Sequence, residues 1–97
     1  MTYSVSISSA AEDDLRKAFL WYKEKGVNLA KDFVRETDET IDEVQIHPLH
    51  SQVKYGNVRV RYMEKFPYGF HYQIKGSKIL IISVFHTSRN PDIWEKR

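Results

Sequence analysis

The sequence predicts an α+β domain with the element order β-α-α-β-β-β, in which a helical hairpin packs on a small, largely antiparallel sheet. Three patterns predict this fold. The first residues alternate between apolar and polar, the region up to residue 47 has apolar residues at helical spacing, and three strand-like stretches with short connections follow. The chain has 97 residues, 41% of them hydrophobic, so we expect a single domain over residues 1–97 with one modest core.

The N-terminal segment predicts a strand that leads directly into a helix. Tyr3, Val5 and Ile7 alternate with serines, which is typical of a strand with one buried face. Ser9 precedes Glu12 by three residues and predicts a capping box, in which each side chain satisfies a free amide at the helix start. The helix should end at Gly26, and its buried face should consist of Leu15, Ala18, Phe19 and Tyr22.

A second helix is predicted from Asn28, as N-cap, to Pro48, which cannot continue a helix. Because so few residues separate it from Gly26, the two helices must run antiparallel. Its predicted buried face consists of Leu29, Phe33, Ile41 and Val44, with Thr37 and Thr40 between them. The acidic residues of the hairpin are predicted to be solvated: Glu24, Asp32, Glu36, Asp38, Glu39, Asp42 and Glu43.

The second half of the chain predicts three strands after a polar loop at residues 49–57. In residues 58–62 two arginines alternate with apolar residues, so one face should pack and the other should be cationic. The almost wholly apolar stretch 79–85 predicts a central strand covered on both faces. The remaining segments are an alternating strand at 68–74 after Pro67, a hairpin turn at 75–78, a break at 89–91 and a single helical turn at 92–97.

Charge divides the chain into two halves. Residues 1–50 contain six Lys/Arg and ten Asp/Glu, a net charge of −4, whereas residues 51–97 contain nine and three, a net charge of +6. We therefore expect Arg59, Arg61 and Arg89 to form one cationic surface opposite the acidic helices. Such a surface would attract nucleic acid or an acidic peptide.

Several classes of protein are excluded by composition. The chain has no cysteine, so disulfides, thiolate metal sites and cysteine nucleophiles are absent. It lacks the apolar stretch of a membrane span and the pattern of a signal peptide, and we expect a cytosolic protein that does not contact membranes. His47 and His50 flank Pro48 and would suit only a loop chelate, so we expect no metal and no other cofactor.

Short motifs along nearly the whole chain carry a family resemblance: residues 11–15, Trp21-Tyr22, residues 29–33, residues 46–48, Arg61, residues 66–68, Tyr72, residues 84–86, Arg89, Pro91 and Trp94. In this order they resemble the RelE/ParE superfamily, the toxins of bacterial type II toxin–antitoxin systems. The resemblance implies a cytosolic toxin, active in plasmid stabilisation and growth arrest, that a cognate antitoxin silences in a hetero-oligomer. RelE-like members cut messenger RNA at the ribosome, and ParE-like members inhibit DNA gyrase. The His-Thr-Ser-Arg-Asn-Pro ending and the first helix look more ParE-like.

RNA cleavage would need a base, an acid and cations around the phosphate. His86, Arg61 and Arg89 are the candidate catalytic residues, with His71 and Tyr68 as further proton-transfer groups. Each also has a plain structural interpretation, since His86 ends a strand, His71 should simply be exposed, and Tyr68 belongs to the core or its rim. The residues predicted to bind a target or antitoxin are Arg59, Arg61, Lys65, Tyr68, His71, Arg89 and Trp94.

The sequence departs from RelE-like nucleases in two places. Those nucleases carry extra lysines before the first arginine strand and a tyrosine near the C-terminal end. Here Lys54 is the only such lysine and no tyrosine follows Tyr72, which favours gyrase inhibition over RNA cleavage. A third alternative is a non-toxic basic module that binds nucleic acid or protein. An acidic and apolar antitoxin segment would suit the sheet edge or the arginines.

Overall fold

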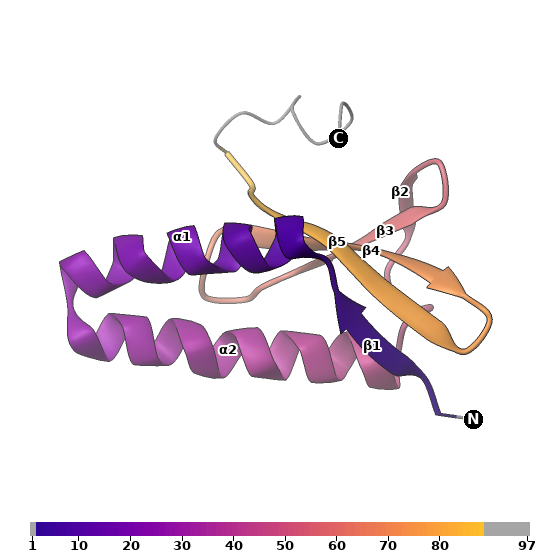
Figure 1. The fold of residues 1–97 in the computed structure, drawn as a ribbon, viewed down its shortest axis with the longest axis horizontal. Helices are drawn as coiled ribbons and strands as arrows, with labels where there is room; N and C mark the ends of the chain where they lie inside the picture. The colour runs from indigo at the N-terminus through magenta and orange to yellow at the C-terminus, as the bar shows by residue number, and fades with distance from the viewer. Residues whose placement is uncertain (1, 89–97) are drawn as a thin grey trace.

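The computed structural model describes residues 2–88 and consists of a helical hairpin on one face of a sheet (Figure 1). This confirms the predicted α+β fold, with one additional strand inside the segment predicted to be a loop. That strand lies between the hairpin and the first arginine strand. The elements are β1 (Ser4–Ile7), α1 (Ser9–Lys25), α2 (Val27–Ile46), β2 (Val53–Tyr55), β3 (Val58–Tyr62), β4 (Tyr68–Lys75) and β5 (Lys78–His86).

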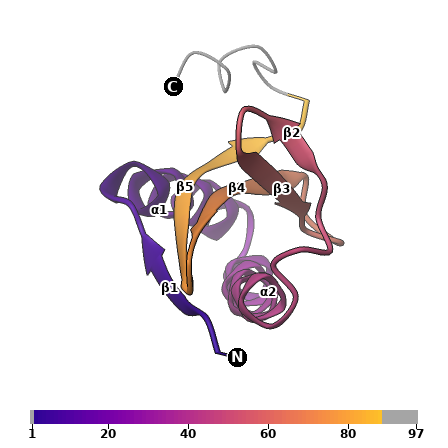
Figure 2. The same cartoon turned by 90° about the vertical axis from the view of Figure 1, so that its right-hand side faces the viewer.

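The five strands are ordered β1-β5-β4-β3-β2, so the first strand of the chain lies beside the last. β1 and β5 are parallel, whereas the other neighbours are antiparallel. Both helices cover the same face of the sheet, as the end-on view shows (Figure 2). We call the opposite face of the sheet the open face.

Helix α1 begins one residue earlier than predicted. The Ser8 hydroxyl accepts a hydrogen bond from the Ala11 amide at 3.1 Å, so Ser8, not Ser9, is the N-cap and the predicted capping box with Glu12 is wrong. The same hydroxyl donates to the carbonyl of Ile82 at 3.0 Å, which ties the helix start to β5. Gly26 ends α1 and precedes the first residue of α2, which confirms the tight antiparallel hairpin.

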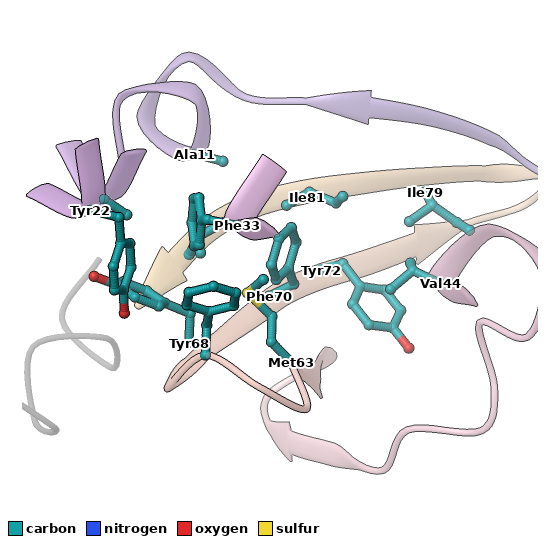
Figure 3. Packing of buried hydrophobic residues seen from close by; sticks show 13 residues of the cluster. Ala11, Tyr22, Phe33, Val44, Met63, Tyr68, Phe70, Tyr72, Ile79 and Ile81 are labelled. Carbon is teal, nitrogen blue, oxygen red and sulfur yellow. The ribbon is translucent and has the colours of Figure 1, made fainter. Parts of the chain in front are cut away.

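The core lies between the hairpin and the sheet, where aromatic rings from both layers meet (Figure 3). Tyr22 and Phe33 pack with their ring centroids 5.2 Å apart, and both contact the Tyr68 ring of β4. The buried stripe of α2 is rotated relative to the prediction, because Ala30 is buried and Leu29 is exposed. The rotation also buries Glu36, one of the acids predicted to be solvated.

Strand β4 is the most enclosed strand, although the prediction gave that place to β5. Residues 68–72 are all buried because β4 occupies the centre of the five-stranded order. In β5, Leu80 and Ile82 are only half-buried, since their face has no helix over it. The predicted strand that is covered on both faces is therefore β4, and not the stretch of residues 79–85.

A bulge in β5 changes which residues face the helices. His71 pairs with Ser83 and Tyr72 pairs with Ile81, so Ile82 is an extra residue on the β5 side. Beyond it, Val84 and His86 lie opposite Phe70 and Tyr68 and share their helix-facing side. The amide of Val84 donates to an Asp14 carboxylate oxygen at 3.0 Å, so α1 holds the bulge in place.

Candidate functional site

Arg59 and Arg61 lie on the helix side of the sheet, not on an opposite cationic surface. Arg59 pairs with Tyr72 and Arg61 with Phe70, and directly opposed residues share a face. Arg61 forms an ion pair with Glu43 of α2 at 3.3 Å, and Arg59 donates to the Ser51 carbonyl at 2.6 Å. The predicted cationic surface opposite the acidic helices is therefore wrong for these two arginines.

Arg61 lines an acidic cleft between α2 and the end of β3. The cleft has a volume of about 370 Å³, and among residues 2–88 Arg61 is the only basic residue that lines it. A phosphate that approached Arg61 would meet several carboxylates, whose charge repels it. The lining residues are Glu36, Glu39, Thr40, Asp42, Glu43, Arg61, Tyr62 and Glu64.

His86 and Tyr68 lie together at the end of the core. Their ring centroids are 5.2 Å apart in an edge-to-face arrangement, and Tyr68 is buried. The Nδ1 atom of His86 lies 3.2 Å from both the amide and the hydroxyl of Ser88. Arg61 is two strands and two residues away in the ladder, a backbone separation of about 12 Å. In addition, the positive charge of Arg61 is paired with the Glu43 carboxylate and not directed toward His86.

His71 is buried on the open face, so the prediction that it is exposed is wrong. Its Nδ1 atom lies 3.2 Å from the Tyr55 hydroxyl, and its ring packs edge-on against Phe85 at 5.3 Å. Burial, and to a smaller extent the positive charge of Lys54, lower the pKa of His71 to about 4, and the negative charge of Asp14 offsets only part of this shift. At neutral pH the imidazole is therefore uncharged. The sequence prediction did not include strand β2, whose Tyr55 covers His71.

The loop between β3 and β4 is held by Glu36 from α2. Its carboxylate accepts the Lys65 amide at 2.9 and 3.2 Å and the Phe66 amide at 3.3 Å. This contact fixes the backbone of Lys65 and leaves that residue exposed. The position of Glu36 in the buried stripe, between Phe33 and Thr40, was the sequence signal for its burial.

Sequence reasoning also missed a notch on the open face. It has a volume of about 50 Å³ and is lined by residues from β3, β4 and β5. Its signal in the sequence was Gly69, a glycine inside a strand that otherwise carries large residues. The notch residues are Tyr62, Gly69, His71, Phe85, His86 and Thr87.

Arg89 and Trp94, both predicted site residues, lie outside the described residues, as does the predicted helical turn at 92–97. Within residues 2–88, the His/Cys/Asp/Glu side chains form no group of three that would hold a metal ion. The rings of His47 and His50 stack in parallel with centroids 4.3 Å apart. No helix in the described part of the chain is both long and apolar enough to cross a membrane.

The candidate catalytic groups among the described residues thus do not converge with Arg61 on one point. Arg61 is in the acidic cleft, whereas the two histidines line the notch, where His71 is uncharged and His86 also packs on Tyr68. General acid–base cleavage of RNA requires a base, an acid and cations around one phosphate. This arrangement is better suited to binding than to such chemistry.

Residues 5–91 match the family described as the ParE toxin of the type II toxin–antitoxin system, parDE. Among solved structures, the chain is similar to the chromosomal ParDE toxin–antitoxin system of P. aeruginosa, with a TM-score of 0.76 and 20% identity. That match covers 88% of this chain and 96% of the other. The toxin–antitoxin complex RelBE2 of Mycobacterium tuberculosis has a TM-score of 0.60 and 15% identity, over 89% and 99% of the two chains. No curated protein matches the chain significantly.

Proposed function

Since this chain belongs to the ParE toxin family of type II toxin–antitoxin systems, we propose that it arrests growth by binding and inhibiting DNA gyrase. The alternative within the superfamily is cleavage of messenger RNA at the ribosome. The two activities make different demands on the toxin, because cleavage needs converging catalytic groups and inhibition needs a complementary binding surface.

The observation that carries this choice is the separation of Arg61 from the candidate proton-transfer groups. Arg61 is paired with Glu43 in a cleft rich in carboxylates, whereas His86 packs on Tyr68. A cation that stabilises a crowded phosphate must be close to the base and must not already be neutralised by a carboxylate. The sequence departures from RelE-like nucleases favour the same choice.

We propose further that a cognate antitoxin neutralises the toxin. Two solved structures with the same fold are toxin–antitoxin systems, which supports a partner of this kind. Strands β1 and β2 are the two edges of the sheet, and an extended antitoxin segment can add to an edge through backbone hydrogen bonds.

The test is a comparison of two assays with the purified chain. Supercoiling of relaxed plasmid by purified gyrase should fall as toxin is added, while a messenger RNA in a bacterial translation extract should stay intact. Cut messages together with undiminished supercoiling would refute the proposal and favour the nuclease branch.

A further inference from the structure

The acidic cleft between α2 and the end of β3 contains more negative charge than its own arginine balances. Among residues 2–88, five carboxylates and one guanidinium line it. The Glu36 carboxylate accepts two backbone amides of the β3–β4 loop, and the Glu43 carboxylate is paired with Arg61. Three carboxylates remain that form no ion pair within the described chain. They are those of Glu39, Asp42 and Glu64.

These carboxylates are better suited to an organic cation than to a metal ion. Within residues 2–88, the acidic and histidine side chains form no group of three that would hold a metal ion. Arg61 shows which kind of group the cleft accepts, because its guanidinium pairs there with Glu43 at 3.3 Å. A volume of about 370 Å³ leaves room for a second long basic side chain, which would find the same kind of contact at the three remaining carboxylates.

The cleft adjoins a part of the sheet edge that β2 leaves uncovered. β2 pairs with β3 only at Val58 and Arg59, so no described strand lies beside the last residues of β3. The Met63 amide donates to the Tyr68 carbonyl at 3.0 Å, and alternate residues of a strand direct their amides to opposite sides. The backbone amide and carbonyl of Tyr62 are therefore directed to the outer edge, at the residue that also lines the cleft.

We propose that an extended segment of the cognate antitoxin adds to this edge of β3 and places one lysine or arginine side chain in the acidic cleft. The inference rests on the proposed function, because it takes the antitoxin as the partner. Strand addition needs a chain that is extended and not yet folded, which suits an antitoxin segment that orders on binding and not the surface of a folded enzyme such as gyrase. Nucleic acid is repelled by the same carboxylates. The segment is thus basic at this point, whereas the charge of the sequence alone suggested an acidic one.

Two double variants that remove the same charge test the cleft. Glu39→Gln with Glu64→Gln neutralises two exposed carboxylates that line it. Asp38→Asn with Glu24→Gln is the matched control, because both acids are exposed on the helical hairpin and neither lines the cleft. The antitoxin used is the product of the reading frame adjacent to the gene of this chain. Titration calorimetry measures its dissociation constant for each variant, and inhibition of purified gyrase and thermal unfolding are measured in parallel.

Neutralising the cleft should weaken antitoxin binding about 10-fold or more, whereas the control should stay within about 2-fold of the parent chain. The affinity of the parent chain should fall more steeply with added salt than that of the cleft variant, because it has more charge contacts to screen. In the complex, hydrogen exchange at the Tyr62 amide should slow about 10-fold or more, since the added strand accepts this amide.

The proposal is overturned if the cleft variant folds and binds the antitoxin as tightly as the parent chain, or if both double variants lose affinity equally. Unchanged exchange at the Tyr62 amide, or a parent affinity that does not depend on salt, overturns it even where the cleft variant fails to fold. Loss of gyrase inhibition with full antitoxin affinity in the cleft variant would assign the cleft to the target and also overturn it.

Failure of the proposed function gives a different pattern. A parent chain that does not bind the adjacent product refutes neutralisation by that antitoxin, and the inference is refuted with it. A parent chain that binds the antitoxin but leaves gyrase active refutes only the choice of target, because the measured affinities and the exchange at Tyr62 still decide the cleft.

Discussion

Replacing Glu36 by alanine should destabilise the protein strongly, although most exposed acids of α2 should be replaceable without cost. Glu36 is only 8% exposed, and its carboxylate is the acceptor for two backbone amides of the β3–β4 loop. Without the Glu36 carboxylate, the Phe66 amide is left buried and without an acceptor, because the Phe66 ring packs in the aromatic core. The Lys65 amide is closer to solvent and can regain a water molecule.

The magnitude follows from these two bonds. A hydrogen bond to a charged group contributes about 1.5–3 kcal/mol, and the 3.3 Å bond of Phe66 belongs at the lower end of that range. Allowing for rehydration of Lys65, we expect Glu36→Ala to lower the free energy of unfolding by about 2–3 kcal/mol. For a domain of this size, that corresponds to a fall in melting temperature on the order of 10 °C.

Urea unfolding followed by circular dichroism measures this change. Glu39→Ala is the matched control, because Glu39 lines the same cleft but is exposed, and it should change stability by less than about 0.5 kcal/mol. An opposite result is conceivable on electrostatic grounds, since Glu36 lies among other carboxylates. If Glu36→Ala equals or exceeds the parent chain in stability, carboxylate repulsion outweighs the two amide bonds and our reasoning is refuted.

Three further predictions concern stability. His71 binds a proton in the unfolded chain below pH 6.5 but in the folded chain only near pH 4, so stability should fall by about 3 kcal/mol as pH decreases through this window. Urea midpoints across the window should show the loss, and a His71→Gln variant should lack it. Ser8→Ala should lower the free energy of unfolding, measured in urea, by about 1 kcal/mol, and Ser9→Ala should lower it much less, because only Ser8 caps α1. Equal losses in the two variants would contradict this cap. Glu43→Gln should shift stability by no more than about 1 kcal/mol, because its ion pair with Arg61 is solvent-exposed, with side-chain exposures of 48% and 32%; a larger loss in thermal unfolding would show that the pair is structural.

Local patterns in the sequence were sufficient for most of the fold. The alternation of Val58 and Val60 with two arginines correctly predicted β3, and Gly26 correctly predicted the turn of the hairpin. β2 was missed because a three-residue strand carries too short an alternation to be recognised. The same strand buries His71, which explains why the prediction for that residue also failed.

The candidate site was harder to predict because it depends on tertiary contacts. The arginine alternation shows that Arg59 and Arg61 share a face, but not which face. That choice is set by pairing with β4, where Phe70 and Tyr72 belong to the core. A shift of one residue in this register would have moved both arginines to the open face.

The bulge at Ile82 decides the place of His86 by the same principle. With regular pairing through β5, His86 would share the open face with Leu80, whereas the extra residue turns it toward Tyr68 on the helix side. The bulge is held from α1, because Ser8 donates to the Ile82 carbonyl and Asp14 accepts the Val84 amide. Two residues near the start of the chain thus hold the strand in the register that places His86 opposite Tyr68. No local pattern in residues 79–86 contains that information.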